Sequence, residues 1–307
     1  MTKLSYFMKN VDAWQPLMSV RYMTEDPFMS HLEAIRRQFA DLVEKPEDDI
    51  ELVEAALLIA RTAFPDLSVS DCTEFLNRWA ERLRKSLGDS PSAGDILIHL
   101  NRILFDEEGF RGNRQNYYDP QNSFLNRVLE RKLGIPISLS LIYSEVGRRA
   151  GFPVHGIALP GHFIVGLLHA SGTLFIDPFN RGEILTEKEC QQRIEARYGR
   201  PAALDKGWKT PATKKEILRR VLRNLKAIYR HLNQDLQSFE MIQWILAVDP
   251  DAPAELKERG LLYEAMGNDA FAVRDLERYL EVDPTSDDND LIAQKIELLR
   301  QSQRRTH

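Results

Sequence analysis

His162 and Asp177 have the residue types and the chain order of a catalytic base and the carboxylate that orients it. Pro-Gly-His-Phe at 160–163 puts His162 at the start of an expected strand, and Phe-Ile-Asp-Pro-Phe at 175–179 puts Asp177 at the end of the next. In covalent catalysis such a histidine takes the proton of a nucleophile, which here would stand on the helix entered through Gly-Ile-Pro at 134–136. No cysteine stands at that helix start. We therefore predict a hydrogen bond of about 3 Å between His162 and Asp177. We also predict that the scaffold lacks the cysteine thiol that would act as the nucleophile.

Ser138 and Ser140 carry the hydroxyl groups nearest to the missing thiol, and they leave two interpretations open. In the first, one serine attacks a substrate with His162 as base and Asp177 as orienter, so that the chain is an active hydrolase or acyl transferase. In the second, both serines satisfy backbone groups near the helix start. We favour the second, because a serine hydroxyl is a weak nucleophile at neutral pH. A displaced nucleophile at Cys190 is disfavoured, since that residue follows Asp177 at an expected helix start.

The loop 111–119 is rich in side chains that donate hydrogen bonds, and nearby glycines allow a ligand to approach its backbone. Its arginines can hold a carboxylate or phosphate in a forked geometry, and its asparagines can bind a peptide backbone. Alternatively, these groups satisfy the loop itself, with Asn122 or Ser123 capping the next helix. As a set, we predict a ligand-binding loop that faces the same cleft as His162, formed by Arg111, Asn113, Arg114, Tyr117, Tyr118 and Asn122.

Composition and charge exclude several functional classes. The 307 residues carry a net charge of −5, and lysines and arginines alternate with acidic residues, so we expect no nucleic-acid partner. No apolar run reaches the roughly 18 residues of a membrane span, and the first residues lack a signal-peptide pattern, so we expect no membrane association and a cytoplasmic location. Cys72 and Cys190 lie far apart without metal-ligand spacing, which predicts free thiols, no metal and no cofactor.

Apolar residues that recur with the helical period predict three or four helices between residues 31 and 105, with Ser70 and Asp95 as N-caps. A further helix begins near Phe124 and is expected to end at Gly134. The next helix closes near Gly151, and the short β-rich runs 155–158, 163–168 and 174–177 follow. This order predicts helices followed by a small antiparallel sheet.

The last third of the chain repeats with an offset of 34 residues, which is the tetratricopeptide period. Tyr229 pairs with Tyr263, and Val-Asp-Pro at 248–250 pairs with Val-Asp-Pro at 282–284. Gly260 and Ala272 occupy positions where that repeat needs small residues for close helix packing. Two repeats are too few to stand alone, so we expect them to stack on a further helix near 291–299 or to dock on the preceding core through residues such as Ile242 and Trp244.

Several motifs in order resemble the SirB-type family of bacterial proteins, which join a transglutaminase-like core to C-terminal tetratricopeptide repeats. The motifs are Gly-Phe-Arg-Gly-Asn at 109–113, Tyr-Tyr-Asp-Pro at 117–120, Asn-Ser-Phe-Leu-Asn-Arg-Val-Leu at 122–129, Gly-Ile-Pro-Ile-Ser-Leu-Ser at 134–140, Arg-Arg-Ala-Gly-Phe-Pro at 148–153 and Pro-Gly-His-Phe at 160–163. The family has no well-established activity, so the resemblance implies a fold rather than a reaction. Carried over from the wider superfamily, the base corresponds to His162, the orienting acid to Asp177 and the nucleophile's position to Pro136.

Together, these observations predict an α+β protein with an N-terminal helical unit (1–105), a transglutaminase-like, papain-like core with a small antiparallel sheet (106–200), a linker (201–214) and tetratricopeptide-like helices (215–307). The predicted function is binding of a protein or peptide through the cleft and the repeat face, on a scaffold that has lost its catalytic cysteine.

Overall fold

The computed structural model describes residues 27–170, 172–199 and 207–306. The chain divides into two compact units. One contains Lys45–Gln234, and the other joins the segment that ends at Glu44 to Asp235–His307. Residues 201–206 of the expected linker lie outside the described residues.

The unit Lys45–Gln234 begins with amphipathic helices whose apolar sides are buried: α4 (Leu52–Arg61), α5 (Val69–Ser86), α6 (Ala93–Asn101) and α7 (Leu125–Arg131). The N-caps differ from the expected ones. Ser68 caps α5 and Ser92 caps α6, while Asp95 completes the capping box with Ser92. Helix α6 continues into a π-helical turn, η4 (Arg102–Glu107).

Helix α7 ends earlier than Gly134, the residue expected to close it. Lys132 adopts the left-handed conformation at the end of α7, with φ of 59°. Gly134 lies instead in the short strand β2 (Leu133–Gly134), which pairs in parallel with β1 (Arg111–Gly112). A Cβ atom at Gly134 would lie 2.7 Å from Ser138 Oγ, so close packing explains this glycine. The pairing fixes the start of the loop 111–119 beside the start of the next helix.

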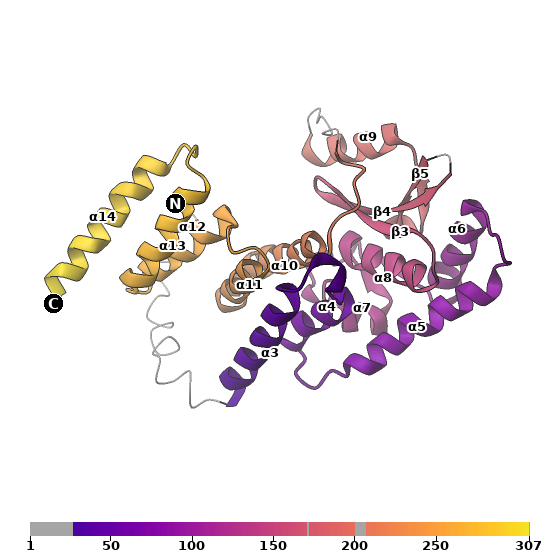
Figure 1. Cartoon of the computed structure of the whole chain (residues 1–307), viewed down its shortest axis with the longest axis horizontal. Coiled ribbons are helices and arrows are strands. Elements are labelled where there is room, and N and C mark those ends of the chain that lie inside the picture. The colour runs from indigo at the N-terminus through magenta and orange to yellow at the C-terminus, as the bar shows by residue number, and fades with distance from the viewer. Residues whose placement is uncertain (1–26, 171, 200–206, 307) are drawn as a thin grey trace. The chain divides into compact units, whose positions relative to one another are not determined.

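The core of this unit is a sheet covered by one helix on each face (Figure 1). Strands β3 (Val154–Leu159), β4 (His162–His169), β5 (Gly172–Asp177) and β6 (Glu183–Leu185) are antiparallel neighbours in chain order. Helix α8 (Pro136–Arg149) packs on one face, where Gly147 allows contact with Val154. Helix α9 (Glu187–Tyr198) covers the other face. The edge strand β6 was not expected from the sequence.

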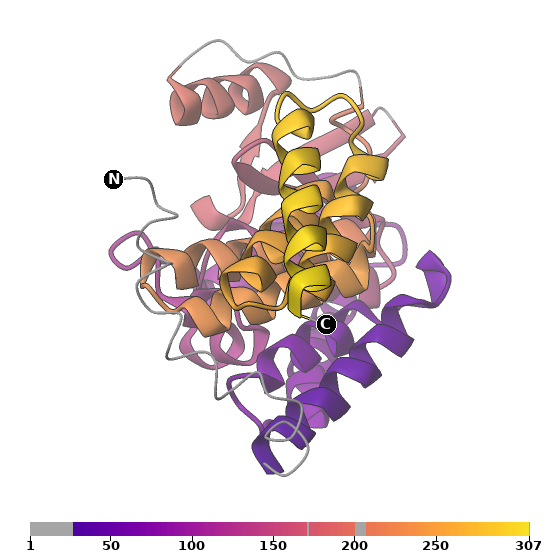
Figure 2. The same ribbon diagram turned by 90° about the vertical axis from the view of Figure 1, so that its left-hand side faces the viewer.

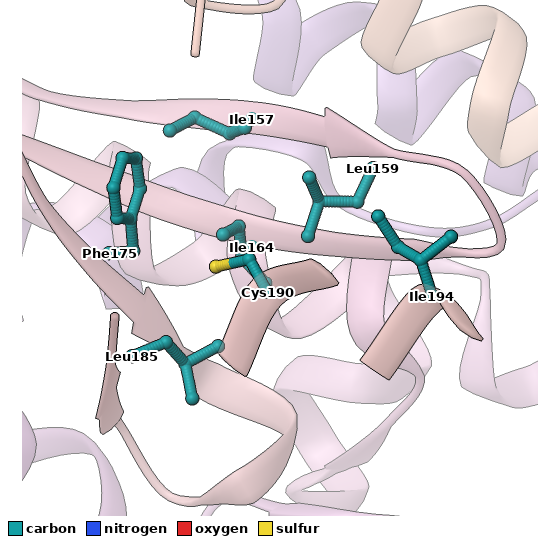
Figure 3. Close-up of a cluster of buried hydrophobic side chains, with 7 residues drawn as sticks. All are labelled: Ile157, Leu159, Ile164, Phe175, Leu185, Cys190 and Ile194. Atoms are coloured by element: carbon teal, nitrogen blue, oxygen red, sulfur yellow. The ribbon is translucent and has the colours of Figure 1, made fainter. Parts of the chain in front are cut away.

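Cys190 and Ile194 of α9 point toward the sheet and complete its apolar layer (Figure 3). The strand residues of this layer are Ile157, Leu159, Ile164, Phe175 and Leu185. They alternate along their strands with residues that face α8, as a two-sided sheet requires. Cys190 is fully buried in this cluster, so its role is packing.

Helix α10 (Lys214–His231), which the repeat period assigned to the tail, packs on α4 and α8 and belongs to this unit. Thr213 caps its first turn, and the Lys214 ammonium group donates 2.7 Å to the carbonyl of Asp48. The backbone N–H of Ala212 donates to Gly156 O of β3 at 2.8 Å. The start of α10 is thus tied to both the helical and the sheet parts of this unit.

The described part of the other unit packs five helices: α3 (Pro27–Val43), α11 (Asp235–Val248), α12 (Pro253–Ala265), α13 (Asp269–Val282) and α14 (Asn289–Thr306). Helices α12, α13 and α14 lie side by side, so the expected further helix stacks on the second repeat (Figure 2). A Cβ atom at Gly260 would lie 2.8 Å from the Leu276 side chain and 3.4 Å from Ala272 O. The predicted close approach at Gly260 and Ala272 is confirmed.

Helix α3 contacts α11 through aromatic rings and an ion pair. The ring centroids of Phe39 and Trp244 are 4.6 Å apart, and both side chains are buried. Arg36 bonds both oxygens of Glu240 at 2.8 Å, and Glu240 accepts the Trp244 indole N–H at 2.7 Å. Trp244 therefore packs on α3. The sequence instead predicted α3 as part of the N-terminal helical unit, residues 1–105, and a contact between Trp244 and the core.

Candidate functional site

His162 and Asp177 form a hydrogen bond across adjacent strands, as predicted. Nε2 of His162, the first residue of β4, lies 2.8 Å from Oδ2 of Asp177, the last residue of β5. The carboxylate fixes the imidazole proton on Nε2. The pair has the base-and-orienter geometry that the sequence indicated.

Asp177 is fully buried and accepts hydrogen bonds from several groups. Its Oδ1 accepts the backbone N–H groups of Phe179 at 3.0 Å and Asn180 at 3.3 Å, which start the turn η6 (Pro178–Asn180). Its Oδ2 also accepts from Asn180 Nδ2 at 2.8 Å and from Arg193 of α9. Burial alone would raise the pKa of Asp177. The hydrogen bonds from His162 and Asn180 and the charge of Arg193 outweigh it and lower this pKa below its usual value.

A cavity of about 190 Å³ opens beside His162. Its walls come from the loop 111–119, the first turn of α8, the start of β4 and one side of α10. The lining residues are Tyr117, Tyr118, Ile135, Pro136, Ile137, Gly161, His162, Phe163, Arg220, Asn224, Ala227 and Ile228. Pro136, which the family resemblance aligns with a nucleophile, therefore lines the same cavity as His162.

Both candidate serines are buried and bond to backbone atoms. Ser138 Oγ donates to Asn122 O at 2.6 Å and accepts the N–H of Ile135 at 3.0 Å. Ser140 Oγ donates to Phe163 O at 3.2 Å. Among the described residues, neither hydroxyl bonds to His162. These contacts match the structural interpretation of the two serines.

The candidate residues of the loop divide into three groups. Tyr117 and Tyr118 line the cavity with His162. Asn113 and Asn122 are buried and bond to each other at 3.0 Å, and Asn122 Nδ2 donates to Asn116 O at 2.7 Å, so this pair holds the loop's own backbone. Their ligand-binding role is therefore the least supported of the set.

The two arginines of the loop do not line the cavity. Arg114 bonds to Asn180 and lies over the ring of Phe179 at 5.0 Å. Arg111 lies in β1 and is exposed. Arg114 thus contacts the turn that follows Asp177, while the cation on the cavity wall is Arg220.

Sequence reasoning missed the wall that α10 provides, Arg220, Asn224, Ala227 and Ile228. It also missed Arg193, the arginine that pairs with Asp177. The helical period alone marked α10 as amphipathic, but no local signal says which element its apolar side contacts. Four of the twelve lining residues come from this helix.

Cys190 and Cys72 have no part in the cavity. Burial raises the pKa of each thiol to about 11, so both are protonated and unreactive near neutral pH. A displaced nucleophile at Cys190 is further disfavoured by its place in the apolar layer between α9 and the sheet.

The fold and the His162–Asp177 pair define a transglutaminase-like core followed by tetratricopeptide helices. A family model described as transglutaminase-like superfamily matches residues 70–223, and one described as tetratricopeptide repeat matches residues 225–297. The chain belongs to the UPF0162 family, and the SirB-type resemblance of its motifs is confirmed.

Relatives of this chain occur in bacteria and animals. A UPF0162 protein of Xylella fastidiosa is 36% identical over 264 residues, which cover 85% of this chain and 94% of that protein. The UPF0162 protein YchA of Escherichia coli is 24% identical over 246 residues, 80% of this chain and 91% of that protein. Human F-box only protein 21 is 27% identical over 285 residues, 80% of this chain and 42% of that protein. No solved structure matches the chain.

The helices of the described part of the chain are too short or too polar to cross a lipid bilayer. The tetratricopeptide match indicates interaction with other proteins.

Proposed function

We propose that this protein binds peptide segments of other proteins in the cavity beside His162 and does not catalyse acyl transfer. The observation that carries the proposal is Pro136. It is the first residue of α8, and it lines the cavity together with His162, at the position where the superfamily places its nucleophile. A proline side chain has no atom that can attack a carbonyl, and it suits the first turn of a helix.

The alternative, an active hydrolase or acyl transferase that uses Ser138 or Ser140, has less support. Ser138 both donates to and accepts from backbone groups, so it would have to leave two bonds to attack a substrate. Ser140 is fully buried, and its hydroxyl bonds to the carbonyl of Phe163. Neither hydroxyl lines the cavity.

The His162–Asp177 pair has a structural role that fits a binding protein. Asp177, at the end of β5, bonds to His162 at the start of β4, to Asn180 of η6 and to Arg193 in the middle of α9. This network holds the imidazole in one orientation at the cavity wall, as a binding site also requires. The tetratricopeptide helices supply a second surface for the same partner or for another protein.

The proposal is tested with the full-length protein in two assays. The first uses a fluorophosphonate probe, which labels activated serines, and a glutamine peptide with hydroxylamine as acyl acceptor. We expect neither labelling nor product. Labelling at Ser138 or Ser140 that is lost in His162→Ala would overturn the proposal in favour of the enzyme.

The second assay measures retention of random octapeptides on the immobilised protein. Ala227→Trp places a large ring at the cavity wall, at an exposed helical position. Ile98→Trp is the matched control, because Ile98 is exposed on α6 and does not line the cavity. We expect retention by the wild type and by Ile98→Trp but not by Ala227→Trp. Equal retention by all three would place the binding elsewhere.

A further inference from the structure

Helix α14 carries two leucines outside the side that packs on α13 (Figure 2). Its packed side consists of the buried residues Ile292, Ile296 and Leu299. Leu291 and Leu298, in contrast, are 63% and 67% exposed, and they are two of the three most exposed large apolar side chains of the described residues. Single exposed leucines are common on protein surfaces. These two are seven residues apart, so they lie on one face of the helix, two turns from each other, and form a line that can pack on another helix.

The charges along α14 are separated by sign. Asp287, just before the helix, and Asp290, in its first turn, are exposed. Arg300 and Arg304, toward its other end, are exposed as well, and Arg300 pairs with Glu277 of α13. Acids at the start of a helix and bases at its end also suit the helix dipole. The leucine line therefore lies between an acidic end and a basic end.

A second, antiparallel copy of α14 complements this pattern. A two-fold axis beside the exposed Gln294 sets Leu291 of each copy against Leu298 of the other, so the same contact forms twice. It also sets the acidic end of each helix beside the basic end of its partner. Parallel helices would place acid beside acid and base beside base, which is unfavourable. Glu297 lies between the two ends, where its carboxylate accepts from Gln301 of the same helix at 3.4 Å.

We propose that two copies of this chain associate through α14, with the helices antiparallel about a two-fold axis near Gln294. A second copy is the occupant because the order of charges that complements α14 is that of α14 itself. A contact between two single helices is small, so the dimer is reversible and depends on protein concentration. The dimer does not depend on the proposed function, since every residue that lines the cavity belongs to the other unit.

The mass of the full-length protein in solution, measured by sedimentation over a range of concentrations, tests for the dimer. We expect the wild type to rise from the monomer mass toward the dimer mass. Leu298→Glu buries a charge in the leucine line and should raise the dissociation constant at least about tenfold. Ile98→Glu is the matched control, because Ile98 is 64% exposed on α6, in the other unit, and should leave the dimer intact. A wild type that stays monomeric, or a Leu298→Glu variant that associates like the wild type, would overturn the proposal.

Charge reversal tests the role of the two helix ends. One variant carries Asp287→Lys and Asp290→Lys, and the other carries Arg300→Glu and Arg304→Glu. Each variant alone has like charges at both ends, so it should associate at least about tenfold more weakly than the wild type. An equal mixture should recover a heterodimer, because the basic ends of one variant then meet the acidic ends of the other. A mixture no stronger than its components would refute the charge pairing.

Disulfide formation tests the direction of the helices. Gln294→Cys places a thiol beside the two-fold axis, so it should form a disulfide-linked dimer in air. Gln301→Cys, also exposed on α14, should not, because antiparallel helices keep the two copies of residue 301 apart. Cys72 and Cys190 are buried and should not contribute. Cross-linking at both positions would indicate parallel helices, and any pattern other than cross-linking at 294 alone would overturn the arrangement.

Discussion

Pro136 and His162 stand at the starts of α8 and β4 and line the same cavity. The imidazole keeps its carboxylate partner at 2.8 Å, while the residue at the nucleophile's position offers no nucleophile. In the proposed binding site, His162 would be a fixed polar group of the cavity wall rather than a catalytic base.

Replacing Pro136 with cysteine should create a reactive thiol. The new side chain would stand in the first turn of α8 and in the cavity of His162, two settings that lower a cysteine pKa. We expect iodoacetamide to label position 136 faster at pH 6–7 than it labels a free cysteine peptide. In the wild type, Cys72 and Cys190 should stay unlabelled because burial raises their pKa to about 11. Adding His162→Ala should slow the reaction, and an unchanged rate would show that the imidazole does not face residue 136.

Asp177→Ala should lower the free energy of unfolding by about 3–5 kcal/mol, because it leaves the partly exposed Arg193 without this buried carboxylate and the backbone donors of Phe179 and Asn180 unsatisfied. Asp106→Ala is the matched control, since Asp106 pairs with Arg181 at the exposed surface. That loss should stay within about 1 kcal/mol. Urea unfolding of both variants provides the measurement, and similar losses would contradict the central place of Asp177.

The stability that Asp177 contributes should depend on pH in one direction. The folded state lowers the pKa of Asp177, chiefly through His162 and against the effect of burial, so the unfolded chain binds the proton more tightly. The contribution is present above the unfolded pKa of about 3.9 and is lost as the pH falls through the lower, folded value. The difference in unfolding free energy between wild type and Asp177→Asn should therefore shrink below about pH 4. If the difference in unfolding free energy instead grew as the pH fell, folding would raise the pKa of Asp177 rather than lower it.

Gly260→Leu should destabilise the helix pair α12–α13. A Cβ atom there would meet the Leu276 side chain at 2.8 Å, so the helices must separate, at a cost of about 1–3 kcal/mol. Gly94→Leu is the control: its Cβ would meet only Ser92 Oγ, at 3.6 Å, on an exposed helix start. Thermal unfolding of the two variants compares them. If both lose the same stability, packing at Gly260 is not the cause.

Phe39 and Trp244 should be energetically coupled. Trp244→Ala removes a fully buried ring and should cost about 3–5 kcal/mol. A double-mutant cycle with Phe39→Ala should give a coupling of about 0.5–1.5 kcal/mol for the aromatic pair. Additive losses would mean that α3 and α11 are stabilised independently of each other.

The sequence predicted the features that depend on local order. His162 and Asp177 follow from β-rich runs with a short turn between them, because antiparallel neighbours bring the start of one strand beside the end of the next. Gly260 follows from the repeat period, because small residues mark close helix packing. Both predictions, the His162–Asp177 bond and the close packing at Gly260, were correct because the residues that make each contact are near each other in the chain.

Features that depend on distant contacts were not predicted. The sequence could not indicate that Trp244 packs on Phe39 or that Arg220 and Asn224 lie beside His162, because an amphipathic helix shows which side is buried but not against what. The N-caps at Ser68 and Ser92 and the left-handed Lys132 differ from expectation for a simpler reason. The exact first and last residues of a helix depend on the backbone geometry of a single residue, and several neighbouring residues could adopt the capping geometry.

The use of α10 as a cavity wall has a consequence for synthesis on the ribosome. Helix α10 packs on α4, which lies far earlier in the chain, so this contact closes late. The sheet and α8 precede α10 in the chain, so the cavity lacks Arg220, Asn224, Ala227 and Ile228 until α10 follows. A nascent chain therefore completes the cavity wall only after α10 has been synthesised, and a chain truncated before α10 would lack the four cavity-lining residues of that helix.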